Sequence, residues 1–503
     1  MFTARRRSII VLCAIATAAV SAAACVRQEG HVATAMRVGV GAPSKGTPGS
    51  GVDYVVTSLM TEPWLTSRPD GRQSERLVTT WSWDDSYTKL TLTLRPDVFF
   101  HDGTPLTSEL AAAILRASIT NREALSFASI AAVRVSGEHR IELELTQPNA
   151  FLLPDLSLAT VRLPNKDAVG AGPFQVVKRD ATGATLSAFP RYYRGRPALE
   201  TVEVVNYPTQ RNAWTALMRG EIDMLHEVSR DAAEFVERAT EVNTYRFPRP
   251  YYIPLVFNVR HPVLKRAEVR QAINQALDRE ELVQEGLNGR GRPGDGPIWP
   301  EHWARSTALR PISFDPAGVK VRLDGLGLQT KPSTDGSLPG RFSFTCLVFA
   351  DDARFERLAI LVQRQLADVG IDMRLLPVKQ PDLVLRLQAG DFDAVLFEMY
   401  GRSLSWLDMF WHSHDKGLIN SGYRSADAVL DRMRTGRSDA EVKAAVAQFE
   451  QILRDDPPAA FMAWQETSRA VSSKIDVSPE KDRDILTNLW QWRPAALQTQ
   501  GDR

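Results

Sequence analysis

Apolar and polar positions in the middle of the chain predict a strand followed by two helices. An apolar run at 255–257 ends in a turn that contains Pro262. In the next segment apolar residues recur at intervals of three and four, which is typical of one helix face. Asp278 is the expected cap of the second helix, with Glu281 as its capping-box partner. The stretch 255–287 is therefore expected to form strand, turn, helix and helix.

Two kinds of pattern divide the rest of the chain. Residues 88–94 and 140–145 alternate strictly between apolar and polar, as half-buried antiparallel strands do. From Gly170 onward, strands alternate with helices. One unit of helix, glycine, acidic residue and strand occurs at 210–225 and again at 380–397. These patterns predict two α/β lobes preceded by a mostly-β region.

The chain begins with a pattern of its own. Three arginines at 5–7 precede an apolar segment at 9–20, and small residues then lead to Cys25. A basic start, a short apolar segment and small residues before a cleavage site are typical of a secretory signal peptide. The apolar segment is shorter than the roughly 20 residues that a membrane-spanning helix needs. We therefore expect an exported protein.

The small residues that end in Cys25 resemble the lipobox of bacterial lipoproteins, in which the cysteine is lipidated and becomes the new N-terminus. Ala22 departs from that motif, which usually has leucine there. The alternative is an ordinary signal peptide that is cleaved near Ala24. Residues 6–10 also resemble a twin-arginine export signal, so the general secretory and twin-arginine routes both stay open.

Length, charge and cysteine content narrow the function classes. A chain of 503 residues with 44% hydrophobic and 24% charged residues is expected to form two or three globular domains. A net charge of +1 gives no electrostatic reason to expect nucleic acid as a partner. Cys346 lies in an apolar run and is expected to be a core residue. No nucleophile elbow, metalloprotease helix, phosphate loop or dinucleotide fingerprint is present in the sequence.

Four separated segments carry a resemblance to a known family. Residues 90–107 (LTLTLRPDVFFHDGTPLT), 170–193, 255–287 and 420–458 resemble, in order and spacing, motifs of the extracellular solute-binding proteins of family 5. Members of that family are the peptide-, nickel- and oligosaccharide-binding proteins of ATP-driven importers. We expect the chain to be such a protein.

The resemblance implies a fold class and a domain division. The implied fold is α/β and periplasmic-binding-protein-like of type II, with two α/β lobes joined by a hinge and an extra mostly-β domain inserted in the first lobe. The first hinge crossing is expected at 255–258. The expected division is 1–24 signal peptide, 25–51 lipidated cysteine, tether and first strand of lobe I, 52–169 inserted domain, 170–257 lobe I, 258–473 lobe II, and 474–503 return to lobe I and polar tail.

The resemblance also implies a function. The chain is expected to capture a small solute, peptide-like or anionic, between its lobes and to deliver it to the permease subunits of an ABC importer. It is expected to act as a monomer in the periplasm or at the outer face of the cell membrane, without catalytic residues, metal, cofactor or nucleic acid. A binding protein that feeds a sensory system is one alternative, and a secreted hydrolase is another.

The loop at 398–407 is the expected site of specificity. Peptide-binding relatives carry an aspartate there, which forms a salt bridge with the ammonium group of the peptide, whereas this chain has Ser403 or, in a second alignment, Ser405. A buried ammonium group without a counter-ion costs several kcal/mol. Arg402 offers a cation instead, which suits a carboxylate, sulfonate or phosphate on the solute.

Aromatic residues around this loop are further candidates, because ligands in α/β folds bind beside loops that follow strands. Tyr400 and Trp406 are expected either to contact the solute or to pack within the loop, and Trp411 is expected to pack. Tyr251 and Tyr252 lie near the expected hinge. The predicted ligand-binding residues are Tyr400, Arg402, Ser403, Trp406 and Tyr252.

Histidines provide one alternative chemistry. His412, His414 and Asp415 have a spacing that could hold a metal ion, but relatives commonly carry polar residues here without metal. We therefore expect no metal site. His101 lies in the FHDG segment, where Asp102 and Gly103 are typical turn residues, and it is expected to have a structural role in that turn.

Overall fold

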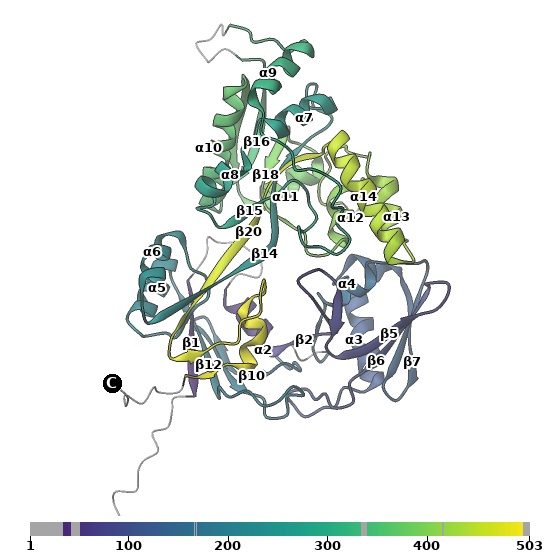
Figure 1. The fold of residues 1–503 in the computed structure, drawn as a ribbon. Coiled ribbons are helices and arrows are strands. Elements are labelled where there is room, and N and C mark those ends of the chain that lie inside the picture. Colours follow the sequence, from purple (N-terminus) through teal and green to yellow (C-terminus); the bar gives the residue numbers. More distant parts are fainter. Residues whose placement is uncertain are drawn as a thin grey trace, which may run out of the picture.

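The computed structural model describes residues 34–41, 51–164, 166, 168–332, 340–414 and 417–495 (Figure 1). The signal segment and Cys25 lie outside the described residues. Figure 1 shows one α/β lobe at the lower left, a second at the top and a mostly-β domain at the lower right. No helix among the described residues is long and apolar enough to cross a membrane.

The first lobe is built on parallel pairing at its N-terminal strand. Strand β1 pairs in parallel with both β12 and β13, and β10 and β11 extend the sheet in antiparallel fashion. Its strands and helices are β1 (Ala35–Gly41), α2 (Val52–Met60), β10 (Phe174–Asp180), β11 (Gly183–Ala188), β12 (Thr201–Tyr207), α5 (Gln210–Met218), β13 (Met224–Leu225), α6 (Arg230–Arg238), β21 (Ile475–Asp476), η3 (Ile485–Gln491) and β22 (Arg493–Pro494).

Helix α2 belongs to the core of the first lobe. Its buried residues Val55, Val56 and Leu59 pack in the same cluster as Val38 of β1 and Trp492 near the end of the chain. The expected division placed this helix in the inserted domain. It packs with the first lobe because its apolar face is complementary to the sheet that begins at β1.

The inserted domain has its own sheet and its own core. Four antiparallel strands lie in the order β5-β6-β8-β7, and the alternation predicted for 88–94 appears as buried Leu90, Leu92 and Leu94. Thr107 caps α3, and its hydroxyl accepts a hydrogen bond from the Leu110 amide at 3.2 Å. The elements are β2 (Glu62–Pro63), β3 (Leu65–Ser67), β4 (Gln73–Glu75), β5 (Val78–Trp83), β6 (Lys89–Leu94), α3 (Ser108–Thr120), η1 (Leu125–Ser129), β7 (Ile130–Gly137), β8 (Arg140–Leu145), α4 (Leu152–Leu156) and β9 (Thr160–Val161).

The second lobe has a parallel sheet covered by helices. Strand β16 pairs in parallel with β17 and β18, and the predicted core residue Cys346 is fully buried in β16. Its elements are α7 (Ala267–Gln275), α8 (Arg279–Glu281), the single π-helical turn η2 (Leu282–Gly286), β15 (Gly291–Pro293), α9 (Pro316–Gly325), β16 (Phe342–Phe349), α10 (Ala353–Asp368), β17 (Ile371–Val378), α11 (Gln380–Ala389), β18 (Ala394–Leu396), β19 (Met399–Tyr400), α12 (Ser405–Trp411), α13 (Asp427–Arg434) and α14 (Asp439–Asp455).

The strand, turn and two helices expected at 255–287 are present, but the capping box is half formed. The Asp278 carboxylate accepts a hydrogen bond from the Glu281 amide at 3.1 Å, as predicted. The Glu281 side chain does not return to the Asp278 amide. It accepts hydrogen bonds from Arg364 and Gln365 of α10, and Gln365 also accepts one from the Asp278 amide. A tertiary partner therefore replaces the local one.

Two long strands connect the lobes. Strands β14 (Val242–Phe257) and β20 (Ala459–Ser472) pair in antiparallel fashion and run from the first lobe into the second (Figure 1). Their register shifts between Pro248 and Tyr252, where Pro248 and Pro250 have no N–H to donate. Leu255 already lies in the core of the second lobe. The irregular segment that joins the lobes is therefore 248–252, and the expected crossing at 255–258 is the end of the same strand.

Candidate functional site between the lobes

The loop that follows β19 lies directly against the crossing strands. Tyr400 pairs with Tyr251 of β14, and the Gly401 amide donates a hydrogen bond to the Pro250 carbonyl at 2.9 Å. A Cβ atom on Gly401 would lie 2.5 Å from the ring of Trp464, so this approach requires glycine. The sequence from 401 onward is thus held at the junction of the two lobes.

Three of the aromatic candidates form one half-buried cluster in which the rings meet edge-on or tilted. The Tyr251 and Tyr400 ring centroids are 5.4 Å apart, and those of Tyr400 and Trp406 are 4.9 Å apart. Burial raises the pKa of Tyr400 to about 12, so its hydroxyl is neutral and can donate a hydrogen bond at pH 7. Tyr400 and Trp406 therefore lie together.

Tyr252 does not belong to this cluster of rings. It is 1% exposed, and its hydroxyl accepts a hydrogen bond from Nε1 of Trp411 at 3.2 Å. Its ring packs on Trp464 with centroids 5.1 Å apart. Because neighbouring residues of a strand face opposite sides, Tyr251 faces the loop and Tyr252 faces the core of the second lobe. Tyr252 and Trp411 are thus packing residues.

Arg402 is exposed and lines two adjacent cavities, of about 370 Å³ and about 40 Å³. Among the described residues, no carboxylate lies within ion-pair distance of its guanidinium group. The smaller cavity is bounded by the crossing strands, at Arg249 and Trp464, and by Trp299 of the second lobe. Arg402 therefore places a positive charge where the two cavities meet.

Ser403 and Ser405 contact a carboxylate from the inserted domain. The Ser405 hydroxyl donates to Oδ1 of Asp155 at 2.6 Å, and the Ser403 hydroxyl lies 3.4 Å from the same oxygen. The second oxygen of Asp155 accepts a hydrogen bond from the Ser126 amide at 3.3 Å. Asp155 is 1% exposed and has no cationic partner among the described residues, and burial raises its pKa. These hydroxyls join the inserted domain to the second lobe.

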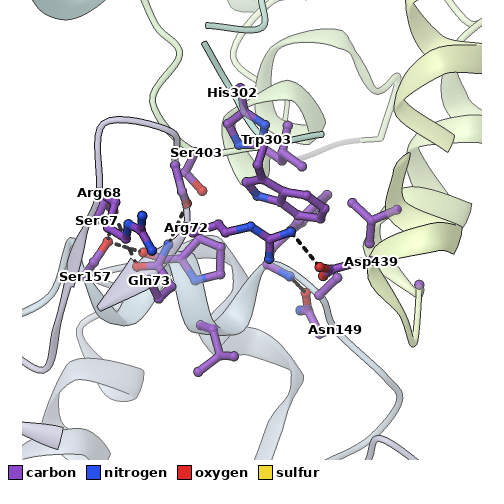
Figure 2. Close-up of a pocket in the computed structure, with 18 of the residues that line it drawn as sticks. Ser67, Arg68, Arg72, Gln73, Asn149, Ser157, His302, Trp303, Ser403 and Asp439 are labelled. Atoms are coloured by element: carbon purple, nitrogen blue, oxygen red, sulfur yellow. Dashed lines mark hydrogen bonds and ion pairs between the residues drawn. The ribbon is translucent and has the colours of Figure 1, made fainter. Parts of the chain in front are cut away.

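The larger cavity beside Arg402 lies between the inserted domain and the second lobe (Figure 2). Its walls come from the turn at 67–73, from 149–158 around α4, and from 302–303, 402–404 and 436–442 of the second lobe. Its volume falls in the range of small-molecule sites. None of these segments except 402–404 was predicted to be part of the site.

A third cavity, of about 440 Å³, lies between α2 and η3 of the first lobe and the inserted domain. Its lining is rich in hydroxyl groups, and Ser157 lines both this cavity and the one in Figure 2. The hydroxyl of Tyr54 donates to Asp484 at 3.0 Å, and Asp484 forms an ion pair with Arg469. The first lobe thus lines this cavity with hydrogen-bonding groups, and the charge of its carboxylate Asp484 is neutralised by Arg469.

The histidine pair, His412 and His414, lines none of the three cavities described above. The rings of His412 and His414 stack with centroids 4.6 Å apart, and Nε2 of His414 lies 3.1 Å from Oδ2 of Asp408. Asp415 lies outside the described residues. Within the described part of the chain, no group of three or more histidine, cysteine or acidic side chains is arranged to hold a metal ion.

His101 joins two of the motifs noted in the sequence. Its Nε2 lies 3.0 Å from the carbonyl of Gly172, and its ring packs edge-on against Phe189. The amide of His101 donates to the carbonyl of Gly170. His101 therefore connects the FHDG turn to the segment at which the chain re-enters the first lobe, which is a structural role.

Two α/β lobes that are joined by two crossing strands and enclose cavities at their junction define a class, the two-lobed solute-binding proteins. Comparisons with known proteins place the chain within that class. The family described as bacterial extracellular solute-binding proteins, family 5, middle part, matches residues 73–417. The chain belongs to this family, and the resemblance seen in the sequence is confirmed.

Two named proteins that are similar in sequence to this chain are also solute-binding proteins. The oligopeptide-binding protein AppA of Bacillus subtilis is 25% identical over 438 residues, covering 79% of this chain and 79% of that protein. The nickel-binding periplasmic protein of Escherichia coli is 24% identical over 442 residues, covering 80% of each. Both are similar to this chain over most of their length. Both relatives are named as binding proteins.

A solved structure confirms the fold class. NikA from Brucella suis, in complex with Fe(III)-EDTA, superimposes with a TM-score of 0.81 at 19% identity, covering 92% of this chain and 99% of that one. The predicted type II fold with an extra domain is therefore correct.

Most residues around the cavity in Figure 2 were not predicted from the sequence. The loop at 398–407 is marked by its position after a strand, but Arg72, Trp303 and Arg437 lie in loops whose partners are distant in the chain. A weak signal was available in the segment GPIWPEHW at 296–303, which is unusually rich in tryptophan and proline for a surface loop. Nothing in the sequence signals the contribution of Asp155.

Proposed function

We propose that this protein is the solute-binding component of an ABC importer of the peptide and nickel type. It captures a solute between its lobes and presents the closed form to membrane permease subunits. The membership of family 5 and the names of the relatives support this role. The observation that carries the proposal is the position of Arg402, an exposed cation at the junction of two cavities between the lobes.

The solute that suits this junction carries an acidic group. Arg402 has no carboxylate partner among the described residues. Asp155, which bonds to Ser405 of the same loop, is buried, and Glu398 of the loop pairs with Arg249 and Arg354. A planar guanidinium group binds a carboxylate or phosphate with two parallel hydrogen bonds. A cationic solute would place an ammonium group beside Arg402 without a counter-ion, which is unfavourable. The proposed solute is therefore an anion.

The test uses whatever solute the protein retains. The protein, purified without unfolding, is analysed by native mass spectrometry, and the solute that it carries is identified and titrated back by calorimetry. Replacing Arg402 with alanine should weaken binding about 10- to 100-fold, the range expected for a hydrogen-bonded charged group. Arg424→Ala, which removes an exposed arginine of the same lobe away from these cavities, is the matched control. Equal affinity of the two variants would refute the assignment of Arg402.

We further propose that Cys25 is lipidated and holds the protein at the outer face of the cell membrane. The small residues before Cys25 and the basic, apolar start of the chain support this. Cys25→Ser should move the protein from the membrane fraction to the soluble extracytoplasmic fraction. Retention of the variant in the membrane fraction would contradict the anchor.

A further inference from the structure

The cavity in Figure 2 is built by the docking of the inserted domain on the second lobe. The Trp303 amide donates a hydrogen bond to the Asp70 carbonyl at 2.9 Å. Gly71 has φ of +81°, and a Cβ atom there would lie 2.5 Å from the ring of His302. The turn at 67–73 therefore lies flat on the loop of the second lobe and covers the cavity from one side.

The cavity has an excess of positive charge. The described residues that line it include four arginines (Arg68, Arg72, Arg402 and Arg437) and a single carboxylate, that of Asp439. The guanidinium group of Arg72 forms an ion pair with this carboxylate at 2.7 Å. In the described part of the chain, neither the Arg402 nor the Arg437 guanidinium group forms an ion pair, and the Glu441 carboxylate accepts its hydrogen bond from the backbone amide of Arg437 at 2.9 Å. The cavity is therefore complementary to an anion.

His302 does not change this balance. Its side chain lies under the turn and is 7% exposed, and burial lowers its pKa to about 4. It is neutral at pH 7, so the charge of the cavity at that pH comes from the arginines.

The remaining walls are aromatic and apolar. Trp303, Trp81 and Trp83 are half-buried and line the cavity, and Phe151 and Leu404 are buried beside them. The guanidinium group of Arg72 lies 4.4 Å above the ring of Trp303, as Figure 2 shows. Indole rings offer a flat apolar contact to a flat group of a ligand.

We infer that this cavity binds an anion that carries a flat apolar group, and this inference rests on the proposed solute-binding function. The acidic group lies between Arg402 and Arg437, and the flat group packs against Trp303 and the tryptophans of β5. The solute thereby contacts the second lobe and the inserted domain together. Its binding favours the docked arrangement, because neither wall alone encloses it.

The exposed Arg72–Asp439 pair lies at the edge of this cavity. The two side chains are 41% and 62% exposed, and an exposed ion pair contributes only about 0.2 to 1 kcal/mol. It can therefore open and close around a solute at little cost. The position of the Trp303 ring beneath Arg72 does not depend on this pair, because the Trp303 amide is bonded to the Asp70 carbonyl.

The experiment compares two probes that differ in charge. After dialysis to remove retained solute, the native protein is examined by ligand-observed saturation-transfer NMR with 3-phenylpropionate and with 3-phenylpropylamine. A ligand of this size is expected to bind at about millimolar concentration when it fits. We expect transfer to 3-phenylpropionate and none to the amine. Equal transfer to both probes, or transfer to neither, would overturn the inference.

Variants locate the binding. Trp303→Ala and Arg437→Gln should each weaken 3-phenylpropionate binding about tenfold or more. Trp214→Ala and Arg424→Ala, which remove a tryptophan and an arginine outside the cavity, should leave it unchanged. Arg437 is exposed, so its variant tests the site even if Trp303→Ala disturbs folding.

Unchanged binding in the Arg437→Gln variant would overturn the inference. The proposed importer function fails separately, if native mass spectrometry and titration reveal no retained or bindable solute of any kind. A retained solute whose affinity depends on Arg402 and not on Arg437 or Trp303 would support the proposed function and refute the inference.

Discussion

Two carboxylates, Asp484 in the first lobe with 14% of its side chain exposed, and the buried Asp155 at the boundary with the second lobe, are held in opposite ways. Asp484 faces Arg469, whose Nε donates to Oδ1 at 2.6 Å while a second guanidinium nitrogen donates to Oδ2. Among the described residues, Asp155 faces only hydroxyl and amide donors, from Ser403, Ser405 and Ser126. The attraction of Arg469 lowers the pKa of Asp484, whereas burial raises the pKa of Asp155.

The difference matches what each region has to do. Arg469, Asp484 and Tyr54 join the first-lobe end of β20 to η3 and α2, and these parts belong to one lobe. Asp155 lies between two units that must separate if the cleft opens. A bidentate ion pair would resist separation, whereas hydroxyl contacts are weaker and can be replaced by water. The static junction thus holds its carboxylate with a bidentate ion pair. At the boundary that must open, Asp155 has hydroxyl contacts, and the ion pair Arg72–Asp439 at the edge is exposed.

The largest expected effect comes from breaking the static pair. Arg469→Met leaves Asp484 buried without its cation and should lower the free energy of unfolding by about 3 to 5 kcal/mol. Urea denaturation at neutral pH measures this. Arg432→Met, at an exposed arginine that bonds only to Gln448, is the control and should change stability by less than about 0.5 kcal/mol. Equal effects of the two substitutions would show that the pair does not stabilise the lobe.

The two carboxylates should also respond to pH in opposite directions. The pKa of Asp484 is lowered, so its contribution to stability is present above the ordinary value of 3.8 and is lost as pH falls through its folded pKa. The pKa of Asp155 is raised, so its contribution is present below 3.8 and is lost as pH rises through its folded pKa.

Asp155→Asn should therefore gain stability relative to the natural chain as pH rises from about 4 to about 8. The asparagine can still accept from the Ser126 amide while it donates to the Ser405 hydroxyl. Thermal unfolding across this pH range measures the difference between the two proteins. A difference that does not vary with pH would mean that Asp155 titrates as it does in the unfolded chain.

The smallest effect on stability is expected at the exposed Arg72–Asp439 pair, where a change in the radius of gyration is also expected. Arg72→Ala should lower the free energy of unfolding by no more than about 1 kcal/mol. Small-angle X-ray scattering without added solute should nevertheless show a larger radius of gyration, because one contact of the docked arrangement is lost. Lys89→Ala removes an exposed pair inside the inserted domain and is the control. An unchanged radius in both variants would show that Arg72 does not hold the units together.

Local pattern was sufficient for much of the fold. The strict alternation at 88–94 and 140–145 predicts strands that are present as β6 and β8, and the caps at Thr107 and Asp278 are formed. Each of these depends on residues that are close in the chain. Where a predicted local contact failed, as for the Glu281 side chain, the competing partner came from α10, which begins some 70 residues later in the chain.

The candidate site also has a part that the sequence predicts and a part that depends on distant residues. The sequence alone predicts the loop at 398–407 as a candidate site, with Arg402, Tyr400 and Trp406 in it, because a loop after a buried strand is marked by local pattern. It also determined the family, through motifs that lie in order along the chain.

The tertiary structure decided what surrounds Arg402. Asp155 lies 248 residues from Ser403 in the sequence, and Arg72 lies 367 residues from Asp439. Such contacts depend on how one folded domain sits on another, which no short segment encodes. The placement of Trp303 at the cavity follows from the same docking. The burial of Tyr252 follows from its packing on Trp464 and Trp411, which are also distant in the sequence. The chain thus specifies its elements and its family locally, and the chemistry of its cavity arises only where separately folded units meet.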